Sequence, residues 1–275
     1  FRDQNPEDWW AGVVSNTREL VDSRPADGIE AMAVSGHMLG LVLVDTAGEP
    51  VIPAMIHSDT RATDEADAIR AEVGDEAFYR ITGNRLDPRS SLCKLDWVRR
   101  NRPADYARAV RVLQSKDFVV GRLVGRFDTT DYSDASHGSF LDVAAGEYAD
   151  DLLAGRGISS ALLPEVRPAT AKAGALSLRA AATLGLPSGI PVAVGAGDGS
   201  SASVGAGATV PGQAYCCLGT TAWIAVCGGT PVIDPVARVF NIMSASGPSC
   251  DWFGTVQSAG ASIQWALGVL GIESF

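Results

Sequence analysis

The chain has 275 residues, of which 46% are apolar, and its formal net charge at pH 7 is −10. This length and apolar content are sufficient for the core of one large domain or two modest ones. The negative charge argues against binding of nucleic acid or of an anionic membrane, which needs clustered Lys and Arg, but it leaves a nucleotide open, because backbone N–H groups and a divalent cation can bind phosphates.

The cysteines and the start of the chain bear on the cellular location of the protein. The five cysteines show no C-x-x-C spacing. This favours reduced thiols in the core of a cytosolic protein over disulfides or a zinc site. No apolar run approaches membrane-spanning length, and the first residues, FRDQNPEDWW, lack the basic and apolar regions of a signal peptide. They also lack an initiator Met. We therefore expect a cytoplasmic protein without a membrane partner, whose chain begins inside a longer reading frame.

A helix followed by strands is predicted for the N-terminal part of the chain. Asn5 is a suitable helix cap, Pro6 suits the first turn, and Trp10, Val13 and Val14 follow at helical spacing. Strands are predicted over residues 29–35, 39–45 and 51–56. Strands beside a helical region are typical of a mixed sheet with helical cover.

Residues 60–126 show a mostly helical pattern that Gly and Pro interrupt. Helices are predicted over residues 60–73, 76–81, 91–100, 103–109 and 115–123, and later over 148–154 and 177–183. Ser115 and the two residues after it would form the cap and first turn of one of these helices.

The segment 191–221 places several glycines around one carboxylate. Three glycines enclose Asp198, and a second turn has the sequence Gly219-Thr220-Thr221. The elements predicted here and beyond are strands over 191–194, 213–218, 222–226 and 239–243 and helices over 200–208 and 258–270. Glycines at strand ends let a backbone approach a ligand closely and present its N–H groups to anionic oxygens. The pattern predicts one acid between two glycine turns, either of which suits a phosphate.

Both turns also have plain structural interpretations. Asp198 could serve as a helix N-cap that accepts from the N–H of Ser200 or Ser201. The residues around Gly219 could form an ordinary hairpin turn. A dinucleotide site is disfavoured, because the glycine spacing lacks a third glycine and no acidic residue follows about twenty positions later.

Ten short segments are spread over essentially the whole chain. They are residues 6–10, 35–43, 58–62, 82–84, 94–97, 115–117, 130–136, 195–198, 218–221 and 258–262. In this order they resemble the FGGY family of carbohydrate kinases, and most closely its xylulokinase-like branch. No single segment is decisive, but the ordered set is hard to produce by chance.

The resemblance implies an α/β fold of the actin/hexokinase type (ribonuclease H-like), with two domains, the sugar deep in the cleft between them and ATP above it. Residues 1–208 would form the sugar-binding N-terminal domain without its first strands. Residues 209–275 would begin the nucleotide-binding C-terminal domain, which is then incomplete. The family's Asp-x-Gly-Thr/Ser strand, which contacts phosphate and Mg²⁺, would precede Phe1, and its Gly-Gly-Gly-Ala adenosine site would follow Phe275.

The activity that the resemblance implies is ATP- and Mg²⁺-dependent phosphorylation of a small sugar, a pentulose such as xylulose or a related ketose or polyol. Asp198 matches the family's catalytic base, and one carboxylate that accepts the hydroxyl proton suits phosphoryl transfer. The implied nucleotide-side residues are Gly197, Gly219, Thr220 and Thr221, of which the last three match the turn that approaches the phosphates. Sugar and ATP are the expected partners, and a homodimer is compatible with the sequence.

The implied sugar pocket departs from the family pattern. The family segment Ser-Gly-Gln-Met-His-Gly is here Ser-Gly-His-Met-Leu-Gly, so His37 replaces an amide and Leu39 replaces a sugar-binding His. Because a lost polar partner changes selectivity strongly, the acceptor is left open among ketoses and polyols. The pocket candidates are His37, Met38, Asp59, Arg80 and Asn84. Asp59 and Arg61 would either shape the pocket wall or form an ion pair that caps the following helix, and we favour the ion pair for Arg61.

Two functional hypotheses follow from this comparison. If the flanking segments exist, the parent protein is a kinase. If the chain were complete, it would lack much of the nucleotide site and would bind sugar, or nothing, without catalysis. Sugar binding without ATP-dependent ADP release would favour the second hypothesis.

Overall fold

The computed structural model describes residues 1–23, 26, 28–247 and 249–272. Its helices are α1 (Pro6–Ser23), α2 (Thr63–Glu72), α3 (Asp75–Thr82), α4 (Ser91–Asn101), α5 (Pro103–Arg108), α6 (Ser115–Val124), α7 (Tyr132–His137), α8 (Asp150–Gly155), the 3₁₀ helix η1 (Ser160–Leu162), α9 (Leu178–Leu184), α10 (Asp198–Gly205) and α11 (Gly260–Leu270). The predicted domain ranges also include positions 24, 25, 27, 248 and 273–275, which lie outside the described residues.

The strands are short in the first part of the chain and longer in the last. They are β1 (Asp3–Gln4), β2 (Ser35–Gly36), β3 (Val42–Val44), β4 (Ala54–Met55), β5 (Arg111–Leu113), β6 (Thr129–Asp131), β7 (Leu141–Asp142), β8 (Glu147–Tyr148), β9 (Glu165–Arg167), β10 (Lys172–Ala175), β11 (Pro191–Ala193), β12 (Ala196–Gly197), β13 (Ala214–Leu218), β14 (Ala222–Cys227), β15 (Phe240–Met243) and β16 (Cys250–Val256).

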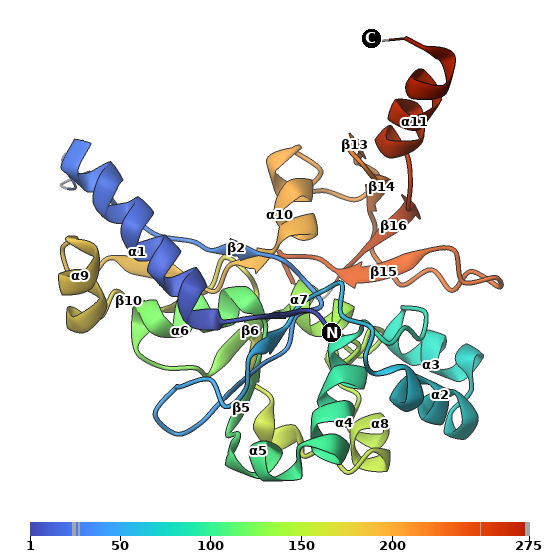
Figure 1. Ribbon diagram of the computed structural model, residues 1–275, viewed down its shortest axis with the longest axis horizontal. Coiled ribbons are helices and arrows are strands. Elements are labelled where there is room, and N and C mark those ends of the chain that lie inside the picture. The colour runs from blue at the N-terminus through green and yellow to red at the C-terminus, as the bar shows by residue number, and fades with distance from the viewer. Residues whose placement is uncertain (24–25, 27, 248, 273–275) are drawn as a thin grey trace.

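The elements are arranged as short strand pairs between helices, with one larger sheet formed by the last four strands. Helices α1, α6 and α9 lie together at one end, and α2 and α3 lie at the other (Figure 1). The pairs β2–β12 and β6–β9 are parallel, whereas the four-stranded sheet, in the order β13-β14-β16-β15, is antiparallel. Within the described part of the chain, no helix is both long enough and apolar enough to span a membrane.

The helices follow local signals in the sequence. α4 begins after Ser90, whose side chain accepts from the N–H of Cys93 at 3.3 Å, and α9 begins after Ser177 in the same manner. Side-chain acceptors at this position satisfy N–H groups that a helix leaves unpaired. α6 differs from the prediction, since its cap is Gln114 rather than Ser115, with Asp117 bonding back to the cap residue.

Several strand predictions are wrong in their extent. The segment 29–35 is mostly irregular, with β2 covering Ser35–Gly36, and β5 and β16 were not predicted. A two- or three-residue strand leaves almost no alternation in the sequence, and its pairing depends on a distant partner. Cys216 lies exposed on β13, so the prediction that all thiols are in the core fails for this residue, although all five cysteines are unpaired.

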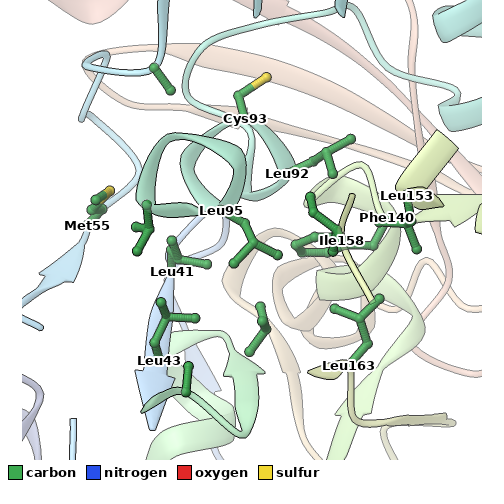
Figure 2. Packing of buried hydrophobic residues seen from close by; sticks show 14 of the residues in the cluster. Leu41, Leu43, Met55, Leu92, Cys93, Leu95, Phe140, Leu153, Ile158 and Leu163 are labelled. Carbon is green, nitrogen blue, oxygen red and sulfur yellow. The ribbon is translucent and has the colours of Figure 1, made fainter. Parts of the chain in front are cut away.

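The largest apolar core packs helices α2, α4 and α8 against β3 and β4. Leu41 lies near Leu95 of α4, whereas Leu92 of the same helix lies on the far side of the cluster with Ile158 and Phe140 (Figure 2). A second core joins α6, α9 and β11, and the partly buried Trp10, Val13 and Val14 of α1 pack on it as predicted. These cores hold the strand ends that carry the candidate site.

Candidate active site

A parallel strand pair brings Asp198 next to the loop 37–40. β2 pairs with β12 in the register Ser35↔Ala196 and Gly36↔Gly197. Parallel neighbours have their carboxyl ends at the same edge of a sheet, where ligands bind in open α/β sheets. Asp198 therefore leaves β12 at the place where His37 leaves β2, although the two residues are far apart in the sequence.

The Asp198 side chain is exposed at the first turn of α10. Its Oδ1 accepts from the backbone N–H of Gly199 at 2.8 Å. The N-cap of α10 is Gly197, so the alternative interpretation of Asp198 as the cap, accepting from Ser200 or Ser201, is wrong. The carboxylate is thus held at the sheet edge while remaining accessible to a ligand.

Gly197 allows the loop 37–40 to pack directly on the start of α10. A Cβ atom at this position would lie 2.4 Å from Cγ of Met38, which is far inside van der Waals contact. Met38 is itself buried and packs with Ala225, Ile242 and Phe253 of the four-stranded sheet. The backbone of Gly197 also donates to Oγ of Ser133 at 3.1 Å. For both predicted site residues, Gly197 and Met38, the structure gives a packing role next to Asp198.

The His37 imidazole is half-buried beside Asp198 and has free hydrogen-bonding capacity. Its ring stands edge-on to Trp9, with centroids 5.4 Å apart, and faces the exposed His57 at 5.7 Å. Neither ring nitrogen has a protein partner among the described residues. Burial lowers the pKa of His37, so the ring is neutral at pH 7 and presents one donor and one acceptor.

Asp59 is fully buried and forms an ion pair with Arg61. The guanidinium group of Arg61 donates to both carboxylate oxygens of Asp59, at 2.9 and 2.7 Å, and also pairs with Asp3. The backbone N–H of Arg2 donates to Asp59 as well. Burial opposes ionisation of Asp59, but the hydrogen bonds from Arg61 outweigh it and lower the pKa to about 2. The favoured ion pair is present, but it does not cap α2, because the N-cap residue of that helix is Ala62 and no side-chain cap hydrogen bond is made there.

Replacement of this carboxylate has a predictable effect on stability. Asp59→Asn should lower the free energy of unfolding at pH 7 by about 2 kcal/mol, because the lowered pKa measures how much folding stabilises the charged form. That stabilisation is present above the unfolded pKa and is lost as the pH falls through about 2, so the difference should shrink in acid. Urea unfolding across this pH range measures it, with Asp64→Asn, an exposed carboxylate of α2, as the control. Equal stability of the two variants would contradict the prediction.

The structure does not bring Arg80 to the other predicted residues, and it buries Asn84. Arg80 lies on the exposed face of α3 and pairs with Glu76 at 2.9 Å. The Nδ2 of Asn84 donates to the carbonyls of Thr82, Ser136 and Asn241, which ties the end of α3 to β15. Asn84 thus acts as a link between the two predicted domains.

The turn Gly219–Thr221 joins β13 to β14, as its hairpin interpretation predicts. The register Leu218↔Ala222 closes the hairpin, and the carbonyls of Gly219 and Thr220 accept from the N–H groups that begin α11. All three residues of the turn are exposed. Hydroxyl groups can bond phosphate oxygens, and the nucleotide role of these residues stays a prediction.

A groove of about 890 Å³ runs between the loop that follows α3 and the four-stranded sheet. Its walls include Arg85, Arg89 and Trp223. Trp223 Nε1 donates to the hydroxyl of Tyr215 at 2.9 Å, and that hydroxyl donates to the carbonyl of Gly199 at 3.2 Å. The groove wall is therefore connected directly to the helix that carries Asp198.

Sequence reasoning missed two side chains of this site, Trp9 and His57. Trp9 belongs to a helix predicted for its apolar face, and His57 follows a strand without any motif of its own. Only their packing around His37 assigns them to the site. In the ranges that the structure describes, no group of three or more His, Cys, Asp or Glu side chains is placed to hold a metal ion.

Comparison with known proteins gives consistent similarities. Residues 1–205 match the family model described as the N-terminal domain of the FGGY family of carbohydrate kinases. The chain is 29% identical over its whole length to the xylulose kinase of Escherichia coli, of which it covers 56%, and 24% identical over 86% of its length to the gluconokinase of Bacillus subtilis, of which it covers 46%. The crystal structure of xylulose kinase from Rhodospirillum rubrum superposes with a TM-score of 0.91 at 30% identity, covering 99% of this chain and 56% of that one. The chain thus spans about half the length of the relatives it matches.

Proposed function

Because the chain belongs to the FGGY family of carbohydrate kinases, we propose that the protein containing it transfers the γ-phosphoryl group of ATP to a hydroxyl of a small sugar in the cytoplasm. The observation that carries the proposal is the exposed carboxylate of Asp198 at the end of β12, beside the loop 37–40 at the end of β2. The actin/hexokinase-type fold agrees with the structural neighbours, which include a glycerol kinase from Plasmodium falciparum at a TM-score of 0.90.

In this proposal Asp198 is the general base. Phosphoryl transfer needs positioning and charge stabilisation, together with one group that accepts the proton of the attacking hydroxyl. The carboxylate is fixed by its bond from the Gly199 N–H and has a second oxygen for that proton. Gly197 and Met38 hold the start of α10 against the sugar loop, so the base stays in register with the substrate.

The sugar side of the site favours a neutral polyhydroxy acceptor. The neutral His37 presents one donor and one acceptor, which suits two neighbouring hydroxyl groups. The relatives named xylulose kinase support a pentulose such as xylulose, and a related ketose or polyol fits the same chemistry. Arg80 and Asn84 remain weaker proposals for this pocket, because each side chain is already bonded elsewhere.

The part of the site proposed to bind ATP is the turn Gly219–Thr221. Its exposed hydroxyls would bind phosphate oxygens of ATP at the mouth of the groove beside the four-stranded sheet. Mg²⁺, when bound with ATP, would neutralise the charge that develops on the transferred group.

The experiment that tests the function is an ADP-release assay on the protein expressed from its complete reading frame. D-xylulose, D-ribulose, glycerol and gluconate are offered with ATP and Mg²⁺, and calorimetry measures binding of each acceptor without ATP. Sugar-dependent ADP release with a ketose is expected. Sugar binding without ADP release would instead support the alternative, a non-catalytic relative that binds sugar. Absence of both sugar binding and ADP release would refute both hypotheses.

His37→Phe should raise the KM for the sugar by about tenfold or more, because the ring keeps its packing on Trp9 but loses both nitrogens that bond hydroxyls. His37→Gln, which keeps one donor and one acceptor, should have the smaller effect. Since burial lowers the pKa of His37 from its usual value, the sugar KM of the unsubstituted protein should be flat between about pH 7 and 8. Steady-state kinetics measure both quantities, and an unchanged KM in His37→Phe would remove His37 from the site.

A further inference from the structure

Lys94 is a buried cation that the proposed mechanism does not use. Its side chain is fully buried in α4. Its Nζ donates to two backbone carbonyls, that of Leu39 at 2.6 Å and that of Ile56 at 2.8 Å. Lysine is rarely buried to this degree without a pairing partner. The position of these two carbonyls in the structure therefore indicates why a lysine is buried here.

The two carbonyls belong to the two loops that carry His37 and His57. Leu39 has a φ of +58°, in the left-handed region that a residue with a branched side chain seldom adopts. Such a conformation persists where the surroundings hold it in place. The ammonium group of Lys94 bonds the carbonyl of this strained residue and fixes it to the neighbouring loop at Ile56.

Two serines hold the carbonyls on either side of this position. Oγ of Ser115, at the start of α6, donates to the carbonyl of His37 at 2.8 Å. Oγ of Ser91, at the start of α4, donates to the carbonyl of Gly40 at 2.7 Å. Three of the four carbonyls of the loop 37–40 are thus bound by side chains from two helices, and Lys94 supplies the charged bond at the strained residue.

We propose that Lys94 is a positioning residue, which holds the left-handed turn at Leu39 and thereby fixes the orientation of the His37 imidazole between Trp9 and His57. Its consequence for sugar binding rests on the proposed function, whereas its effect on the loop does not. The groups that face Lys94 include Asp59 and Asp87, which favour its charge, and Arg61 and Arg89, which oppose it. Burial is the largest effect and lowers the pKa of Lys94 to about 8, so the test is made at pH 7, where the charged form predominates.

The test is NMR of the imidazoles of His37, His57 and His137 in Lys94→Met, with Lys172→Met as the same change at an exposed position. In the unsubstituted protein the ring of Trp9 should shift the His37 signals, because the two rings stand edge to face. We expect Lys94→Met to abolish this shift while the signals of the half-buried His137 remain dispersed and report an intact fold. His37 signals that do not move in Lys94→Met overturn the proposal.

A second variant separates positioning from general stabilisation. Glycine adopts positive φ without strain, so adding Leu39→Gly to Lys94→Met should restore the His37 signals at least in part. It should also rescue Lys94→Met if that variant folds poorly. A double variant whose His37 stays displaced, or that folds no better, overturns the proposal.

The kinetic arm links the inference to the sugar. Lys94→Met should raise the sugar KM by about tenfold with a smaller change in kcat, because the base Asp198 lies on a separate strand. A KM equal to that of Lys172→Met, with displaced His37 signals, would show that His37 does not bind the sugar. A protein that phosphorylates no sugar would refute the proposed function and leave the NMR result to decide the role of Lys94.

Discussion

Asp198→Asn is expected to lower kcat for sugar phosphorylation by about 10²- to 10⁴-fold, the contribution that a positioned general base typically makes. The amide keeps the size of the side chain and can still accept from the Gly199 N–H, so α10 and the loop packed on it should stay in place. The variant loses the group that takes the hydroxyl proton. Sugar binding measured by calorimetry should therefore change little.

The matched control is Asp64→Asn, which replaces another exposed carboxylate in the first turn of a helix. It alters the net charge and the helix end in the same way, without touching the site. If Asp198→Asn retained the kcat of this control, Asp198 would not be the base. If it lost sugar binding instead of kcat, its role would be to orient the substrate.

Lys116→Met should cause the largest loss of stability, about 3–5 kcal/mol, which is the typical effect of removing one partner from a buried ion pair. Lys116 is fully buried, with its Nζ 2.5 Å from Asp117, 2.9 Å from Asp131 and 3.3 Å from Asp134. Burial opposes the charge of Lys116, but the three carboxylates outweigh it and raise its pKa well above the usual value. Methionine would fill the space and leave three buried acids without a cation.

The pH dependence of this loss has a defined sign. Burial raises the pKa of Asp134 well above 3.8, and loss of the lysine would raise it further. An acid with a raised folded pKa makes the protein less stable as the pH rises, so Lys116→Met should lose more at pH 8 than at pH 5. Urea unfolding at both values measures the difference, with Lys172→Met as the exposed control. If Lys116→Met does not fold, adding Asp134→Asn should recover folded protein, and failure to do so would contradict this account of the cluster.

The cluster also bears on activity, because a chain of hydrogen bonds joins it to the residue that precedes the base. Asp131 accepts from Oγ of Ser133 at 2.5 Å, and that oxygen accepts from the N–H of Gly197 at 3.1 Å. Gly197 is the N-cap of α10 and immediately precedes Asp198. Disturbance of Lys116 should therefore lower kcat in addition to stability.

The sequence alone predicted most of the helices and singled out the candidate acid. α4 and α9 were predicted to within a few residues, because the serine caps of both helices and the glycine that ends α9 act within one turn of the chain. The resemblance to the family, carried by ten segments, is confirmed by the match over residues 1–205. It singled out Asp198 and the loop 37–40, and the assigned roles remain proposals.

Only the tertiary structure decided what surrounds that acid. The β2–β12 pair links strands of two residues each, too short to leave a periodic signal. Trp9, His57 and Lys94 join the loop 37–40 from three other segments, and the sequence around each gives no sign of it. Charged side chains are normally solvated, so composition predicts Lys94 and Lys116 at the surface. Their burial depends on carbonyls and carboxylates that folding brings together from distant parts of the chain, and local sequence patterns carry no information about such encounters.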